Sequence, residues 1–290
     1  RKAGVGEMAR AVGSWIRVSG FAGAKAVLNG FYEVATGTDA NDIVVAKGTG
    51  TAVGDHTAGD SVSIVQLSRV TNGTSDESYV FEEQVADIAS EFEAFTHMVA
   101  NTLALRSQRG QGGGGSRVVI DVGFVGGSST KETATTGDGS PTAKTTNRPY
   151  TAAGGEGAFF CFENDTKFKV VEIGLNITNG REANKNLGDL PPESAGSGKF
   201  RSTVNWRAYA KALHQSFETA ARAGTRRDLA YVFTDAEGNC DIFHAPQVVY
   251  EAPEKPVPGK EQRRFFAAKG MVEKETTLGF AMQWCRYNAP

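Results

Sequence analysis

Two alternating stretches, each closed by the tripeptide Thr-Asn-Gly, constrain the fold of this chain more than any other feature of its sequence. Polar and apolar residues alternate from Ser61 to Val70 and again from Phe168 to Ile177, and a period of two is typical of a strand with one buried face. Thr-Asn-Gly follows at residues 71–73 and at residues 178–180. Because Asn-Gly tolerates the positive φ of a tight turn, each copy predicts a strand that ends and reverses. The similar order of elements after each copy indicates a duplicated building block rather than an enzyme.

The composition favours a strand-rich protein without a strongly charged face. Glycine contributes 35 of the 290 residues, about 12% against a usual figure of about 7%, which suits a fold with many reversals. The net charge of −2 does not predict the basic surface that binds nucleic acid tightly. The sequence lacks the apolar core of a signal peptide and any run of about 18 apolar residues, so we expect no membrane partner.

The three cysteines, Cys161, Cys240 and Cys285, indicate synthesis in a reducing compartment. Their number is odd, and no two of them form a Cys-x-x-Cys pair. We therefore expect each thiol to fill a small apolar space in the core rather than to join a disulfide framework.

The first half of the chain predicts an N-terminal arm, several strands and one helix. Residues 1–20 are rich in Gly and Ala and predict an arm that orders against a partner surface, with a short strand at Trp15–Val18. A helix is predicted from Val85 to Met98, because apolar residues recur there at spacings of three and four. Further strands are predicted at residues 27–34, 43–46, 61–70, 77–82, 101–106 and 117–125.

The middle of the chain separates two units. Residues 126–157 are rich in Gly, Ser and Thr and poor in aliphatic side chains, so they predict a linker or a long surface loop. They divide an N-terminal unit, residues 1–125, from a C-terminal unit, residues 158–290. In the second unit a helix is predicted from Tyr209 to Ala221, with Gly224 as its stop. Strands are predicted there at residues 168–177, 199–206, 229–234, 241–250, 263–269 and 277–287. The predicted fold class is mainly β, with two β-sandwich or barrel units that each carry one flanking α-helix and that derive from an internal duplication.

No motif of the sequence predicts catalysis, a cofactor or a metal. The segment Gly196–Lys199 is followed by Phe200 where a phosphate-binding loop needs Ser or Thr, and no Gly-x-Ser-x-Gly elbow occurs. Cys240 and Asp241 with His244 come closest to a metal site, but zinc requires further ligands that are not visible nearby in the sequence. We therefore predict no catalytic, cofactor-binding or metal-binding residue.

Glu82 and Glu83 belong to a local acidic run that continues with Asp87 and Glu91. The ordinary interpretation is a solvated surface. The alternative is the wall of a pore, in which case Glu82 and Glu83 are the residues that we expect to face the lumen.

The order of four passages resembles the tail tube proteins of long-tailed phages. The passages are Leu28–Val34 with Ile43–Ala46 and Gly59–Val62; Ser68–Thr74 with Ser78–Glu83; Leu175–Gly180 with Leu187-Gly188; and Tyr231–Asp235 through a Pro- and Gly-rich excursion to Thr277–Ala281. The resemblance covers most of the chain beyond residue 27.

The resemblance implies a structural virion protein with no cofactor. Its copies would form rings that stack into the tail tube, the conduit for DNA ejection, and DNA would pass through the lumen without specific binding. A tape-measure protein inside the tube and other tail proteins at its ends would be further partners. The protein would be made in the bacterial host cytoplasm and reside in the virion tail. Two units in one chain favour a ring of three chains, with a ring of six as the alternative.

Two other classes of protein stay open at this point. A β-sandwich carbohydrate-active enzyme would use acids scattered over its strands, and a secreted adhesin would need an export signal. Electron microscopy separates these classes, because a tube protein forms rings or tubes and the others are expected as isolated monomers.

Overall fold

The computed structural model of the chain describes residues 11–35, 43–50, 62–73, 77–84, 91–108, 117–137, 150, 157–164, 166–184, 194–196, 198–209, 213–252 and 265–290. Strands dominate these residues, which confirms the prediction of a mainly β protein. The strands before residue 133 are β1 (Trp15–Ser19), β2 (Gly30–Val34), β3 (Val45–Gly48), β4 (Ser63–Gln66), β5 (Ser68–Thr71), β6 (Ser78–Gln84), β7 (Phe92–Gln108), β8 (Val119–Val125) and β9 (Ser128–Glu132). The later strands are β10 (Gly157–Glu163), β11 (Thr166–Phe168), β12 (Glu172–Thr178), β13 (Ala183–Asn184), β14 (Ser194–Ala195), β15 (Arg201–Tyr209), β16 (Arg227–Asp235), β17 (Cys240–Tyr250), β18 (Phe265–Val272) and β19 (Gln283–Tyr287). The described helical elements are the 3₁₀ helix η1 (Gly23–Leu28) and the α-helix α1 (Leu213–Arg222).

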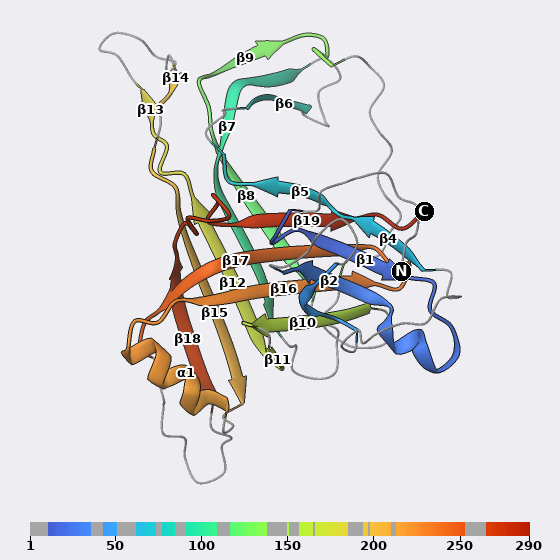
Figure 1. Cartoon of the computed structure of the whole chain (residues 1–290). Coiled ribbons are helices and arrows are strands. Elements are labelled where there is room, and N and C mark those ends of the chain that lie inside the picture. The colour runs from blue at the N-terminus through green and yellow to red at the C-terminus, as the bar shows by residue number, and fades with distance from the viewer. Residues whose placement is uncertain are drawn as a thin grey trace, which may run out of the picture.

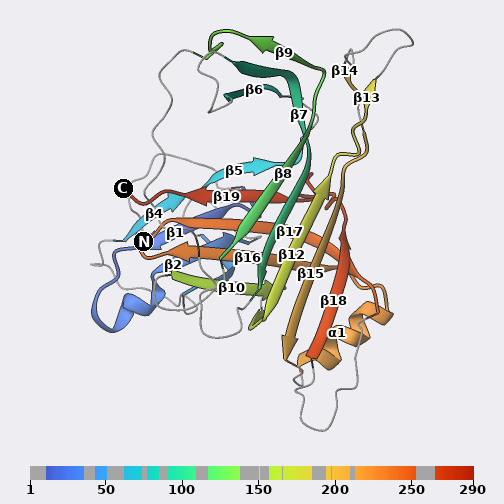
Figure 2. The same ribbon diagram turned by 180° about the vertical axis from the view of Figure 1, so that it is seen from behind.

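Three layers of strands make up the body of the molecule. A thirteen-stranded antiparallel sheet contributes two of them, because β12, β15, β18 and the second part of β7 run in one direction while β10, β16, β17 and β19 run across it (Figures 1 and 2). A separate four-stranded sheet, in the order β3-β2-β1-β4, forms the third layer. We call it the small sheet and the thirteen-stranded one the main sheet.

Strand β16 shows how the three layers share their cores. Leu229, Tyr231 and Phe233 point into the main core, between the two crossing parts of the main sheet. The alternate residues, Ala230 and Val232, point to the other side, where they pack in a cluster with side chains of the small sheet. A strand segment buried on both faces is apolar throughout, as β16 is from Leu229 to Phe233.

The small sheet corrects the prediction of an N-terminal arm. Trp15 and Ile16 of β1 are each only 1% exposed, and β1 pairs with both β2 and β4. The sheet also has its own apolar cluster, which includes Val18, Tyr32 and Val34. The prediction of an arm is therefore wrong for Trp15–Ser19, while residues 1–10 lie outside the described residues.

Helix α1 confirms the second predicted helix, although it begins later than expected because Tyr209 still belongs to β15. Its Phe217 ring lies 4.7 Å from that of Trp206 and 4.5 Å from that of Tyr250, between centroids. Gly224 has φ +64° and ends the helix, as predicted.

The first predicted helix, from Val85 to Met98, is wrong over the part that the structure describes. Residues 85–90 lie outside that part, and from Phe92 onward the chain is β7. Most residues of this stretch are half-buried on both faces of the strand, so apolar residues do not alternate. A bulge at residues 96–97 also brings Phe95 and Met98, three positions apart, to the same side of β6. The spacing therefore mimicked a helix.

The two Thr-Asn-Gly copies end strands as predicted, but neither forms a hairpin between paired neighbours. Strand β5 ends at Thr71 and pairs with β19, and β12 ends at Thr178 and pairs with β7 and β15. The Asn72 side chain instead accepts hydrogen bonds from two backbone N–H groups, of Ala281 (2.8 Å) and Met282 (3.0 Å). Asn179 donates from its side chain to the carbonyl of Ala100 (2.9 Å). Each asparagine thus ties its turn to a strand distant in sequence.

The main sheet takes strands from both sides of the predicted linker, with β12 bound directly to β7. Part of the linker, Ser128–Glu132, is β9, which has few apolar residues but pairs along β7. Strand β10, an apolar run that no alternation marks, was not predicted. The division into units 1–125 and 158–290 and the duplication stay predictions. No helix among the described residues is long and apolar enough to cross a membrane.

Candidate assembly surface

A bend in β7 carries three strands away from the body of the molecule. The second part of β7 pairs with β12 and β8, whereas residues 92–99 pair with β6 and β9. The bend contains two β-bulges. The first, at residues 96–97 opposite β6, includes His97, which has φ +55°. The second lies opposite β8, where Asn101 is the extra residue. Bulges of this kind increase twist and turn a strand out of its sheet. We call β6, β9 and residues 92–99 of β7 the flange, which projects at the top of Figures 1 and 2.

The flange exposes apolar side chains on both faces. Tyr79 and Phe81, 48% and 38% exposed, lie on one face with Phe124, whose ring is 6.0 Å from Tyr79 and 4.6 Å from Phe81. Val80, which points the other way along the strand, is 62% exposed. All seven residues of β6 are exposed. A sheet of only three strands, such as the flange, needs a covered apolar face for stability in water, so this surface is suited to burial against a partner.

Glu82 and Glu83, the two residues predicted to face a lumen, lie on β6 of the flange and point to opposite faces of it. Glu82 accepts hydrogen bonds from Thr135 Oγ1 (2.6 Å) and from Thr136 N and Oγ1 (2.6 and 2.8 Å). These bonds lower the pKa of Glu82 and hold the turn after β9 against the flange. Glu83 lies directly opposite Glu93 of β7. Whether either residue faces a lumen stays a prediction.

Strand β8 is a second uncovered apolar element, and its role was missed by the sequence reasoning. Ile120 and Val122 stand opposite Leu105 and Leu103, on the side of the sheet that carries the main core, yet they are 40% and 44% exposed. Among the described strands β8 pairs only with β7, so its other edge is open. What marks such a surface is a strand with several apolar side chains that stay exposed among the described residues of the single chain.

The outward face of the main sheet is polar, and its strand cations are mostly paired. Arg106 Nη2 lies 3.0 Å from Asp121 Oδ2, and Arg207 Nε lies 3.4 Å from Glu172 Oε2. Lys269 of β18 is likewise paired with the acid that follows β17. Arg201, at the start of β15, forms no ion pair with a described residue.

The residues that the sequence singled out as nearest to a metal pair do not meet. Cys240 is fully buried in an apolar cluster, and Asp241 accepts a hydrogen bond from Trp284 Nε1 (2.8 Å). His244 instead meets Glu33 and Asp228, with one ligand-type atom of each within 4.8 Å of the others. The ammonium group of Lys47 already lies between these two carboxylates, so the protein's own cation offsets part of their negative charge.

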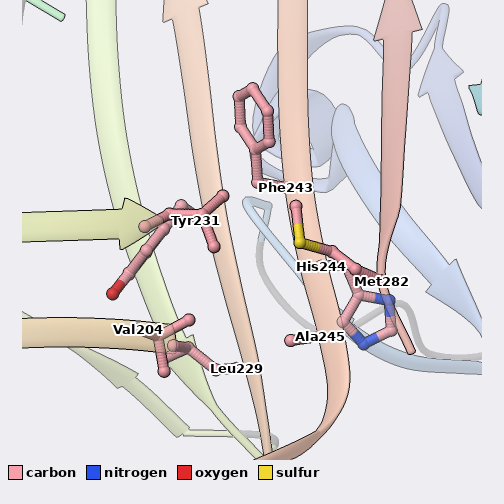
Figure 3. Close-up of a pocket in the computed structure, with 8 residues that line it drawn as sticks. Val204, Leu229, Tyr231, Phe243, His244, Ala245 and Met282 are labelled. Atoms are coloured by element: carbon pink, nitrogen blue, oxygen red, sulfur yellow. The ribbon is translucent and has the colours of Figure 1, made fainter. Parts of the chain in front are cut away.

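A small cavity adjoins His244 in the main core (Figure 3). It encloses about 10 Å³, about the space of one water molecule, which is too little for a substrate. Its lining is almost wholly apolar and consists of Leu175, Val204, Leu229, Tyr231, Phe243, His244, Ala245 and Met282.

All three cysteines are free and buried, as predicted. Burial raises the pKa of the Cys161, Cys240 and Cys285 thiols, to about 12 for Cys285. A thiol that stays protonated and covered is a poor nucleophile and a poor metal ligand. These residues therefore belong to the cores.

Comparison with known proteins identifies one family. The family model described as phage tail tube protein matches residues 18–268. A comparison with curated proteins found no match.

Proposed function

Because the chain belongs to the phage tail tube protein family, and so is a structural protein of the virion tail, we propose that its copies form stacked rings that make the conduit for DNA ejection. The observation that supports this assembly is the flange, whose apolar side chains stay substantially exposed on both faces among the residues that the structure describes. A monomer that leaves such a sheet in water gains stability by burying it against another copy.

Two kinds of contact are needed, one within a ring and one between rings. The flange and the open edge of β8 are the two surfaces suited to them, because one offers two apolar faces and the other an unpaired strand with apolar side chains. A permanent interface typically buries more than about 2,000 Å² in total, so further surface of the chain would contribute as well.

Electron microscopy of the purified full chain tests the assembly. We expect rings at low concentration and tubes at high concentration. Isolated monomers at every concentration and salt condition that stabilises the fold would contradict the proposal.

For the ring we favour three chains over six. If each chain holds two similar units, residues 1–125 and 158–290, then three chains supply six units. That is the number of units in a ring of six chains with one unit each. Cryo-electron microscopy of the tubes decides this, since a true sixfold axis within a ring would refute the ring of three.

For the lumen we propose a wall that is acidic or neutral, with Glu82 and Glu83 as the candidate residues, one from each face of the flange. A ring multiplies each phosphate contact by its copy number, and each contact adds affinity through counterion release, so free cations would hold the DNA. The pairing of Arg106 and Arg207 with acids on the outward face of the main sheet is consistent with that requirement. Tape-measure protein inside the tube and other tail proteins at its ends are the further partners that we expect.

Filter binding of duplex DNA to preformed tubes tests the lumen. We expect no measurable affinity at physiological salt. A lumen lined mainly by lysine and arginine in a tube structure would contradict the proposal without affecting the assembly itself.

A further inference from the structure

The small sheet is seated on the main sheet as a layer with a core of its own. Its cluster includes Ile16, Val18 and Tyr32, and on its other side Trp15 and Phe31 pack against the main sheet. Apolar contact of this kind is strong but not directional, because it depends on area rather than on the alignment of particular atoms. Something else must select one position of the small sheet.

A chain of buried polar groups crosses the same boundary. From the small sheet come Glu33 on β2 and Lys47 on β3, whose Nζ lies 2.8 Å from Glu33 Oε2. From the main sheet comes Asp228 on β16, which contacts the same ammonium group through Oδ1. The Lys47 side chain is only 2% exposed. One lysine thus joins carboxylates of both sheets; Lys47 and Glu33 are buried, and the side chain of Asp228 is 22% exposed.

The chain continues through His244 on β17. Its Nε2 lies 2.7 Å from Asp228 Oδ2, and its Nδ1 lies 2.6 Å from Nε2 of Gln283 on β19. The same Gln283 nitrogen donates to the carbonyl of Gly13 (2.6 Å), just before β1. Because a carbonyl oxygen only accepts, the Gln283 amide must present its N–H groups here.

This arrangement sets the tautomer of His244. Since the Gln283 N–H donates to Nδ1, the ring proton of neutral His244 sits on Nε2 and is donated to Asp228. An Nε2 that carries a proton offers no lone pair, so this nitrogen must lose its proton before it can bind a metal ion. The result is a chain of ion pairs and hydrogen bonds with defined donors and acceptors, which we call the relay. It runs from Glu33 of the small sheet through Lys47, Asp228, His244 and Gln283 to the carbonyl of Gly13, just before β1.

We infer that this relay is a docking lock: it seats the small sheet on the main sheet in one position, and the loss of one charged partner releases the small sheet while the main sheet stays folded. The reason is that a buried charge without its partner is far more costly than a neutral group in the same place. The least costly response is to move the small sheet so that water reaches the orphaned group, because that sheet keeps its own core. The inference does not depend on the proposed assembly.

Two charged groups of the lock, Asp228 and Lys47, have shifted pKa values in the folded protein. His244 and Lys47 hold the pKa of Asp228 below its usual value, against the opposing effect of burial. Burial lowers the pKa of Lys47, but Asp228 and Glu33 outweigh it and hold that pKa above its usual value. The other charged groups of this region, Glu163 and Arg227, form an ion pair with each other (2.5 Å). Lys47 and Asp228 therefore stay ionised through neutral pH.

Hydrogen–deuterium exchange of the full chain tests the lock. In Lys47→Met, which keeps most of the length of the side chain without its charge, we expect amide protection in β1, β2 and β3 to fall at least tenfold. Protection in β15 and β18 should be unchanged within twofold. The control is Asp121→Asn, which breaks an exposed ion pair and should leave both sheets as in the wild type.

A triple variant separates unpaired charge from lost packing. Glu33→Gln, Lys47→Met and Asp228→Asn together remove all three charges and keep groups that can hydrogen-bond, so protection of β1–β3 should return to within about threefold of the wild type. If Lys47→Met does not fold but the triple variant does, the lock is supported. Equal loss of protection in both sheets of Lys47→Met, no loss in either, or a triple variant no better than the single one would overturn the inference.

Discussion

Removing the aromatic face of the flange should block assembly and leave the fold intact. The change is Tyr79→Ser with Phe81→Ser, two residues that contact each other and Phe124 across β6 and β8. Both side chains are substantially exposed in the single chain, so little of their surface contributes to the core. Their remaining surface is what a neighbouring copy could bury.

The exposed fractions give the size of the effect. If each ring side chain carries roughly 200 Å², exposures of 48% and 38% leave about 170 Å² for an interface. At about 25 cal/mol per Å², burial of that surface stabilises each contact by about 4 kcal/mol. Since about 1.4 kcal/mol is a tenfold change, the upper limit is about a thousandfold in the concentration needed for assembly. The entropy cost of ordering side chains at the interface reduces this gain. We therefore expect the concentration needed for assembly to rise between about tenfold and a thousandfold.

Sedimentation of a dilution series, with electron microscopy of the pellets, measures the critical concentration. Loss of the contacts with Phe124 should lower the melting temperature by only a few degrees, because an aromatic pair contributes about 0.5–1.5 kcal/mol. The matched control is Val27→Ser, which removes a 58% exposed apolar side chain on η1, away from the flange. Assembly of the double variant at the wild-type concentration, or an equal rise in the control, would refute the reasoning.

Three further predictions concern stability. His97→Val should unfold at lower denaturant than His97→Gly, by about 1–2 kcal/mol in the free energy of unfolding, because φ +55° is strained for a β-branched residue and free for glycine; equal values would show that the bend does not depend on this residue. Gly270→Ala should cost about 1–3 kcal/mol, since its Cβ would lie 2.6 Å from Val248 Cγ1 in the packed pair of β17 and β18, and thermal melts would show it. The pKa of Asp228 is lowered in the folded protein, so the stability that its ionised carboxylate contributes is complete above the unfolded pKa of about 3.9 and is lost as pH falls through the lower folded pKa. Melting temperatures between pH 2 and pH 7 should therefore fall less steeply on the acid side in Asp228→Asn than in the wild type. Parallel curves for the two proteins would contradict this role of Asp228.

Strand β7 differs most from the elements that the sequence predicts. The sequence predicts a helix and then a separate strand, and both belong to one long strand that is half-buried on its two faces. Period-two alternation appears only where one face meets water, as in β15, whose pattern of burial alternates residue by residue. Where both faces are covered, or where a bulge adds a residue, the pattern no longer identifies the element.

The candidate surface was partly predictable. The strand that carries Tyr79 and Phe81 was predicted, and the acidic pair beside them was identified. The apolar edge at Ile120 and Val122 was not, because in the sequence these residues look like those of any core strand. Their exposure becomes visible only when the layer that covers the neighbouring strands is seen to end before β8.

The sequence by itself determined the class of the protein: the mainly β character, the strand ends at the two Thr-Asn-Gly copies, the burial of the cysteines and the family. These follow from local alternation, turn chemistry and side-chain type, all of which act over a few neighbouring residues. Only the tertiary structure decided which strands share the main sheet and which polar groups meet. Lys47 and Asp228 are 181 residues apart, and their pairing depends on how whole sheets pack, so no local pattern of the chain records it.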